Sequence, residues 1–172
     1  MDEKYNFKKV FIITTSILVI SLFLYYKNND LASKIMKNQS VLFELDKNYE
    51  EILNLDYDGS NILKNILINK SVKNIKKFES LRLESQNKIK NLNDLYKDKK
   101  YFDNVKKIET LHNEIFLTEK NYIYFIQKNI SSEILLDSNY FYLKSEYSKL
   151  ILSNINYAKG KIIANISKEY IY

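Results

Sequence analysis

Residues 10–26 read VFIITTSILVISLFLYY, an uncharged apolar run on which the interpretation of the whole chain depends. A run of about 17–25 apolar residues spans the hydrocarbon core of a bilayer, and flanking tyrosines and lysines suit its two interfaces. The flanks of this run are Lys8, Lys9, Tyr25, Tyr26 and Lys27. We therefore predict a single transmembrane helix over residues 10–26, preceded by a short polar segment, residues 1–9.

The apolar run is expected to stay in the protein as a signal-anchor. A cleavable signal peptide has a shorter apolar region, followed by small residues at the cleavage site. Here the run passes directly into the sequence YYKNND at residues 25–30. The alternative is a core helix of a soluble protein, which would need other elements to cover it on all sides.

The lysines around the run set its predicted orientation, because basic residues near the ends of a span favour the cytoplasmic side. Lys4, Lys8 and Lys9 precede the run, whereas Lys27, Lys34 and Lys37 follow it. The basic residues on the two sides of the run are therefore nearly balanced. Since Lys8 and Lys9 directly adjoin the run, we predict a cytoplasmic N-terminus, with the C-terminal domain outside.

The remaining residues, 28–172, are expected to form one all-α domain. The chain has no proline and only two glycines, so the usual breakers of helices are nearly missing. Four helices are predicted at about 28–57, 61–96, 103–129 and 133–171. They should continue from the membrane helix and pack as an antiparallel bundle with coiled-coil-like contacts.

The helix boundaries follow from local signals. Residues 57–61, YDGSN, are the best turn signal, since Gly59 is able to adopt a positive φ and Ser60 or Asn61 is able to cap the next helix. The sequence KDKK at residues 97–100 predicts a second break, and Asp103 a further cap. Gly160 is either the end of a helix or a tolerated interior glycine.

Apolar residues recur at alternating steps of three and four along these segments, as expected for helices packed along a seam. The first seam is predicted at Leu31, Ile35, Asn38, Leu42, Leu45, Tyr49 and Ile52. Tyrosines on such stripes, predicted to pack in the core, are Tyr49, Tyr122, Tyr140, Tyr147 and Tyr157. Asn38 and Asn154 interrupt two seams, and a buried polar residue there sets register or oligomeric state. The alternative places both at the edges of their stripes.

Basic and aromatic side chains are concentrated around the second predicted break. They are Lys97, Lys99, Lys100, Tyr101, Phe102, Lys106 and Lys107. Such a mixture suits contact with anionic lipid headgroups. The alternative is a solvated junction between helices. Residues 31–59 carry an acidic excess that offsets the basic excess of residues 60–110 within one molecule, so no nucleic-acid partner is predicted.

No pattern in the sequence predicts catalysis, a metal or a cofactor. Glu109 and His112 give half of a carboxylate di-metal motif, but the chain has no second histidine to complete it. We therefore interpret them as an ordinary exposed pair. Cysteine is absent, and two distant glycines cannot form a phosphate-binding loop.

The function expected from these features is that of a membrane-anchored scaffold, stalk or accessory subunit that is not an enzyme. Its partners would be the lipid bilayer and other subunits of a membrane or envelope complex, or further copies of itself. The alternative is a sensor-type bundle that binds a ligand at the membrane surface.

Overall fold

The computed structural model describes residues 3–70, 72–128 and 138–169, with side chains from residue 11 to residue 168. Every regular element in these ranges is a helix, which confirms the all-α class. The elements are α1 (Glu3–Asn69), the short 3-10 helix η1 (Val72–Asn74), α2 (Ile75–Leu95), α3 (Lys99–Gln127) and α4 (Ser138–Glu169). They form two units, one of residues 41–164 and one of residues up to 40 with those from 165 onward.

The N-terminal apolar run belongs to α1, which is unbroken from Glu3 to Asn69. The first helix of the bundle therefore continues directly from the apolar run, as the sequence predicted. Every residue from 11 to 30 is exposed, and none of the apolar window is buried. A core helix of a soluble protein would be covered, so that interpretation is wrong for these residues. The helix is long and apolar enough to cross a membrane.

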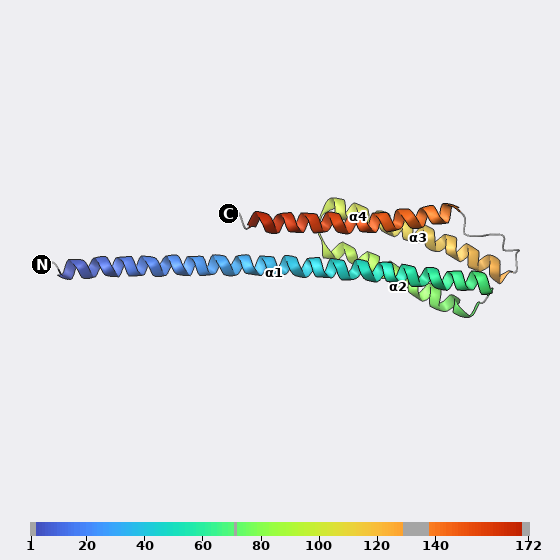
Figure 1. The fold of residues 1–172 in the computed structure, drawn as a ribbon, viewed down its shortest axis with the longest axis horizontal. Coiled ribbons are helices and arrows are strands. Elements are labelled where there is room, and N and C mark those ends of the chain that lie inside the picture. Colours follow the sequence, from blue (N-terminus) through green and yellow to red (C-terminus); the bar gives the residue numbers. More distant parts are fainter. Residues whose placement is uncertain (1–2, 71, 129–137, 170–172) are drawn as a thin grey trace. The chain divides into compact units, whose positions relative to one another are not determined.

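Residues 41–164 form an antiparallel four-helix bundle (Figure 1). Along each pair of neighbouring helices, residue numbers rise on one helix as they fall on its partner, as antiparallel packing requires. The polar contacts that show this are Glu51–Lys88 and Asp56–Arg82 (α1 with α2), Arg82–Glu119 and Gln86–Asn113 (α2 with α3), Glu119–Tyr140 and Asn104–Asn154 (α3 with α4), and Asp46–Lys159 and Asp56–Lys144 (α1 with α4).

The core of the bundle is built from positions that alternate at steps of three and four. Leu45, Tyr49 and Ile52 are buried on α1, which confirms the phase of the predicted seam. The pattern continues on the other helices. Core residues there include Phe78, Ile89 and Leu92 on α2, Val105, Ile108 and Ile115 on α3, and Tyr147, Ile151 and Ala158 on α4.

The turn predicted at residues 57–61 is wrong, because α1 passes through it and ends at Asn69. The second helix, expected over 61–96, therefore begins only at Ile75. The chain leaves α1 through Lys70, whose φ of 48° is left-handed. Gly59 is instead a point of close approach: a Cβ added there would lie 2.9 Å from Cζ of Arg82. Glycine makes room for that guanidinium.

The break predicted at residues 97–100 is confirmed between α2 and α3, but the capping residue is Asp98 and not Asp103. Asp98 has extended backbone angles, and its carboxylate accepts a 3.0 Å hydrogen bond from the backbone N–H of Tyr101. The predicted start and end of the last helix, at 133 and 171, lie outside the described residues. Gly160 is inside α4 and exposed, so it is an interior glycine.

Replacement by alanine is predicted to have opposite effects on stability at the two glycines. Gly160→Ala should raise the free energy of unfolding by about 0.5–1 kcal/mol, because nothing lies within 4 Å of the added Cβ and alanine is the better helix former. Gly59→Ala should lower it by about 1–3 kcal/mol, because the new methyl group displaces a buried guanidinium. Chemical denaturation followed by circular dichroism measures both. Equal stabilisation by the two substitutions would contradict the close approach at Gly59.

Candidate functional site

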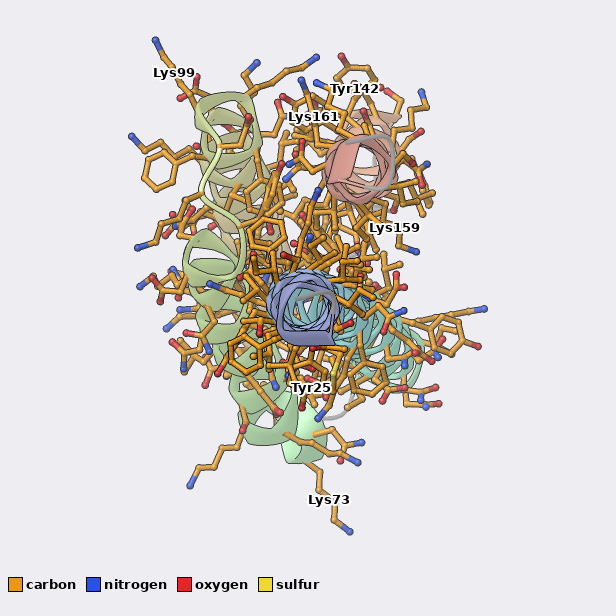
Figure 2. All side chains as sticks on the ribbon, turned by 90° about the vertical axis from the view of Figure 1, so that its left-hand side faces the viewer. Tyr25, Lys73, Lys99, Tyr142, Lys159 and Lys161 are labelled. Atoms are coloured by element: carbon orange, nitrogen blue, oxygen red, sulfur yellow. The ribbon has the colours of Figure 1, made fainter. Side chains whose placement is uncertain are left out.

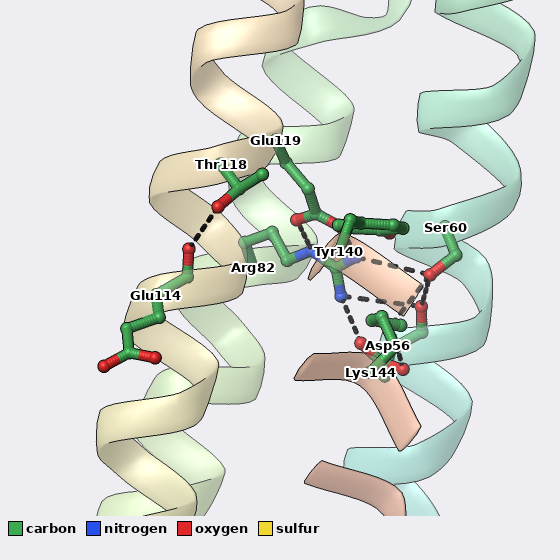
Figure 3. A network of polar contacts seen from close by, with 8 residues as sticks. All are labelled: Asp56, Ser60, Arg82, Glu114, Thr118, Glu119, Tyr140 and Lys144. Carbon is green, nitrogen blue, oxygen red and sulfur yellow. Dashed lines mark hydrogen bonds and ion pairs between the residues drawn. The ribbon is translucent and has the colours of Figure 1, made fainter. Parts of the chain in front are cut away.

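The most concentrated chemistry in the bundle is a cluster of charged side chains buried between its four helices. We call it the Arg82 cluster; its members are Asp56 and Ser60 from α1, Arg82 from α2, Glu119 from α3, and Tyr140 and Lys144 from α4 (Figure 3). Arg82 is the only arginine in the chain, which otherwise uses lysine for its basic residues. Both Arg82 and Glu119 are fully buried.

Arg82 and Glu119 form a two-pronged ion pair. Nε of Arg82 donates to Oε2 of Glu119 at 2.7 Å, and Nη2 donates to Oε1 at 2.5 Å. This parallel arrangement needs the planar fork of arginine, because the single ammonium group of lysine cannot form it. The hydroxyl of Tyr140 adds a third hydrogen bond to Glu119 at 2.9 Å.

The rest of the cluster binds the other side of the guanidinium. Nη1 of Arg82 donates to Oδ1 of Asp56 at 2.7 Å, and the second oxygen of Asp56 pairs with Lys144. Lys144 also donates to Ser60 Oγ at 3.0 Å, while Ser60 donates to the backbone oxygen of Asp56 at 2.8 Å. Two positive and two negative groups are thus balanced inside the bundle.

Burial and pairing act against each other in the cluster. Burial lowers the pKa of Arg82, but the charges of Glu119 and Asp56 outweigh it and hold that pKa above its ordinary value. Burial raises the pKa of Glu119, against the opposing effect of Arg82, and lowers the pKa of Lys144, against that of Asp56. Each charge therefore depends on its partners, and removing one would leave another buried and unpaired.

A second group of polar side chains lies nearby, consisting of Ser85 on α2, His112 on α3 and Tyr147 on α4. All three are buried, and within the described part of the chain neither imidazole nitrogen, nor Ser85 Oγ, nor the Tyr147 hydroxyl forms a hydrogen bond of ordinary geometry. The rings of His112 and Tyr147 pack with centroids 6.0 Å apart. Burial lowers the pKa of His112 to about 4, with Arg82 and Lys144 acting in the same direction against Asp56.

Asn154 centres a third polar layer; it is fully buried, so of the two alternatives it lies inside its seam and not at the edge of its stripe. Its Nδ2 donates to the Tyr49 hydroxyl at 2.9 Å, and its Oδ1 accepts from Asn104 at 3.0 Å. Tyr101 joins this layer to α2 by donating from its hydroxyl to the backbone oxygen of Leu92 at 3.2 Å. That Asn154 sets register stays a prediction. Asn38 is half-buried and lies in the other unit.

The predicted membrane flanks lie partly within the described residues. Tyr25 and Tyr26 are 61% and 69% exposed, and their rings meet edge to face. Lys27 is also exposed. The side chains of Lys8 and Lys9 lie outside the described residues.

The residues predicted to contact anionic lipid are exposed, with one exception. Tyr101 is fully buried, so its inclusion is wrong: it occupies the first core position of α3. Lys97, Lys99 and Lys100 are exposed, and Figure 2 shows Lys99 extending away from the ribbon. Lys106 lies over the ring of exposed Phe102, 4.6 Å from its centroid, and lines a groove with Lys107.

The interpretation of Glu109 and His112 as an exposed pair is wrong. His112 is 1% exposed, whereas Glu109 is half-buried. The core positions of α3 run 101, 105, 108, 112, 115 and 119, so His112 falls in the interior despite its polarity. Among the described residues, no group of three potential ligand side chains is placed to hold a metal ion.

The sequence interpretation missed Asp56, Arg82, Ser85 and Glu119, because it placed charged and polar residues on outer faces. One signal was available. A single arginine among many lysines marks a position where lysine does not suffice. Asp56 also follows Tyr49 and Ile52 at the spacing of the first seam.

The arrangement favours a structural role for the Arg82 cluster, because its charged groups are saturated by one another. Comparisons with protein-family models, curated proteins and solved structures find no match. The function must therefore be inferred from the chain itself.

The buried histidine predicts a loss of stability in acid. The pKa of His112 is about 4 when folded and 6.5 ordinarily, so folding favours the neutral form. The stabilisation is complete above the ordinary pKa and is lost as the pH falls from about 6.5 towards 4, by up to about 3 kcal/mol. Chemical denaturation of both chains over that pH range measures the free energy of unfolding. This free energy should fall in the native chain and should not show the same fall in His112→Gln. Parallel pH profiles for the two chains would contradict it.

Proposed function

We propose that this protein is a single-pass, membrane-anchored helical scaffold or accessory subunit that acts by binding other proteins. The observation that carries the proposal is the uncovered apolar surface of α1. Sixteen consecutive residues, 11–26, are exposed and contain no charge. Leaving such a surface in water costs about 25 cal/mol for each Å² of apolar area, and a bilayer removes that cost.

The interior of the bundle supports a scaffold over a sensor or an enzyme. The buried tyrosines, which first suggested a ligand pocket, are used in internal contacts: Tyr49 with Asn154, Tyr101 with Leu92, and Tyr140 with Glu119. Side chains that already bind one another are poorly suited to bind a ligand. The chemistry left for partners is on the outside of the bundle.

The lysines of α1 and of the α2–α3 junction suggest how the chain meets the lipid. Lys8 and Lys9 favour a cytoplasmic N-terminus, which places the bundle outside the cytoplasm. The exposed Lys97, Lys99 and Lys100 are suited to anionic headgroups, whose surface attracts each nearby basic residue by about 1 kcal/mol.

Charges placed within the apolar run test the anchor. Leu18→Lys combined with Leu22→Lys should move the chain from the membrane fraction to the soluble fraction, because each lysine at the centre of a span costs about 2.5–3.5 kcal/mol. Alkaline extraction of membranes measures the distribution. The matched control is Leu117→Lys with Leu152→Lys, two leucines 62% and 53% exposed on the bundle. The control should remain in membranes, and a native chain found in the soluble fraction would refute the anchor.

A further inference from the structure

A groove of about 620 Å³ lies on the bundle between α3 and α4. Its apolar wall is formed by Leu111, Leu150 and the ring of Tyr142, which is 61% exposed. Three lysines stand around it, Lys106, Lys107 and Lys149. The acidic side chain in the lining is Glu146, which pairs with Lys149 at 3.1 Å. The groove therefore presents an apolar surface inside a basic rim.

A stripe of opposite character lies on α1 beside α4, where three of its residues, Asp46, Glu50 and Leu53, line a hollow of about 460 Å³ together with Lys159. Its residues recur at steps of three and four and are Phe43, Asp46, Glu50, Leu53 and Tyr57. Phe43 and Tyr57 are 67% and 68% exposed, and Glu50 is exposed between them. Asp46 is half exposed beside Lys159, with which it pairs. We call this set the α1 stripe; it offers aromatic ends and a carboxylate centre.

The stripe is long enough to cover the groove, and its charge is opposite to that of the groove's rim. From Phe43 to Tyr57 the helix rises about 21 Å, at about 1.5 Å per residue. The α4 side of the groove, from Tyr142 to Ser153, covers about 16 Å at the same rise. An amphipathic helix in an apolar groove is a common mode of protein recognition, with anchors at just such spacings. The acidic centre of the stripe would meet the basic rim.

We propose that the occupant of the α3–α4 groove is the α1 stripe of a second copy of this chain. This deepens the proposed function, on which it rests, by naming the first partner of the scaffold. The contact joins two different surfaces, so a pair of copies keeps one free stripe and one free groove for further neighbours, and the assembly is a ring or a row. Pairing of groove with groove, or of stripe with stripe, would bring like charges together.

Disulfide trapping tests which surfaces meet, and the chain suits it because it has no cysteine of its own. Glu50→Cys and Lys107→Cys are made as separate full-length chains, purified in detergent micelles and mixed under mild oxidation. We expect a cross-linked dimer in the mixture and none in either chain alone. The matched control mixes Glu50→Cys with Lys77→Cys, an exposed lysine on α2, and should give none. Equal cross-linking in the control, or cross-linking of Glu50→Cys with itself, would overturn the proposal.

Charge reversal tests the same contact without oxidation. A chain with Glu50→Lys and a chain with Lys106→Glu and Lys107→Glu should each associate about tenfold more weakly than the native chain in analytical ultracentrifugation. Mixing them should restore association, because each reversed surface then faces its complement. The control pair Lys76→Glu and Lys77→Glu on α2 should associate as the native chain does, and circular dichroism confirms that each variant is folded.

The outcomes separate this inference from the proposed function. A native chain that is monomeric at every concentration, yet remains in membranes and copurifies with other proteins, overturns the self-contact and leaves the scaffold proposal in place. Association that the mixture of reversed chains fails to restore overturns the assignment of these two surfaces. Occupation of the groove by an acidic segment of another protein, or by anionic lipid, would also appear as failure of this rescue.

Discussion

The buried guanidinium of Arg82 is the constraint on which the bundle depends. A charge cannot be moved out of water unless partners replace the water around it, and here the residues of the cluster around Arg82 come from the other three helices of the bundle. Glu119 and Asp56 bind the two sides of the fork; Tyr140 binds the carboxylate of Glu119, Lys144 binds that of Asp56, and Ser60 accepts a hydrogen bond from Lys144. A shift of any helix by one turn would leave a charge unpaired, so the cluster favours one register over others.

The same constraint accounts for features that otherwise look unrelated. Gly59 is inside a helix because the guanidinium lies against it, at 2.9 Å from where a Cβ would be. His112 stays neutral in part because Arg82 and Lys144 are near. A buried ion cluster adds little net stability by itself, since desolvation offsets much of the attraction. We expect the cluster to contribute specificity of register, while apolar packing between the helices supplies the stabilisation.

The sequence predicted those parts of the structure that depend on local pattern. The apolar run, the break at residues 97–100 and the seam through Leu45, Tyr49 and Ile52 all follow from composition and spacing. The Arg82 cluster could not be predicted in this way. Sequence patterns assign charged residues to solvent-exposed helix faces, and they do not reveal charges that neutralise one another across four helices. The error at Gly59 has the same cause: glycine was interpreted through its own backbone freedom, whereas a residue 23 positions away requires it. Grooves and exposed stripes likewise depend on which helices become neighbours.

Because the chain holds a single arginine, nitrogen-15 NMR of the guanidinium tests the central claim most directly. The Nε–H group of Arg82 gives one signal, and its exchange with water is measured in the folded chain at mildly alkaline pH. Burial against Glu119 predicts a proton that is protected from exchange until the bundle unfolds. An Nε–H signal that exchanges as fast as that of free arginine would show that the guanidinium is in water, and would contradict the buried cluster.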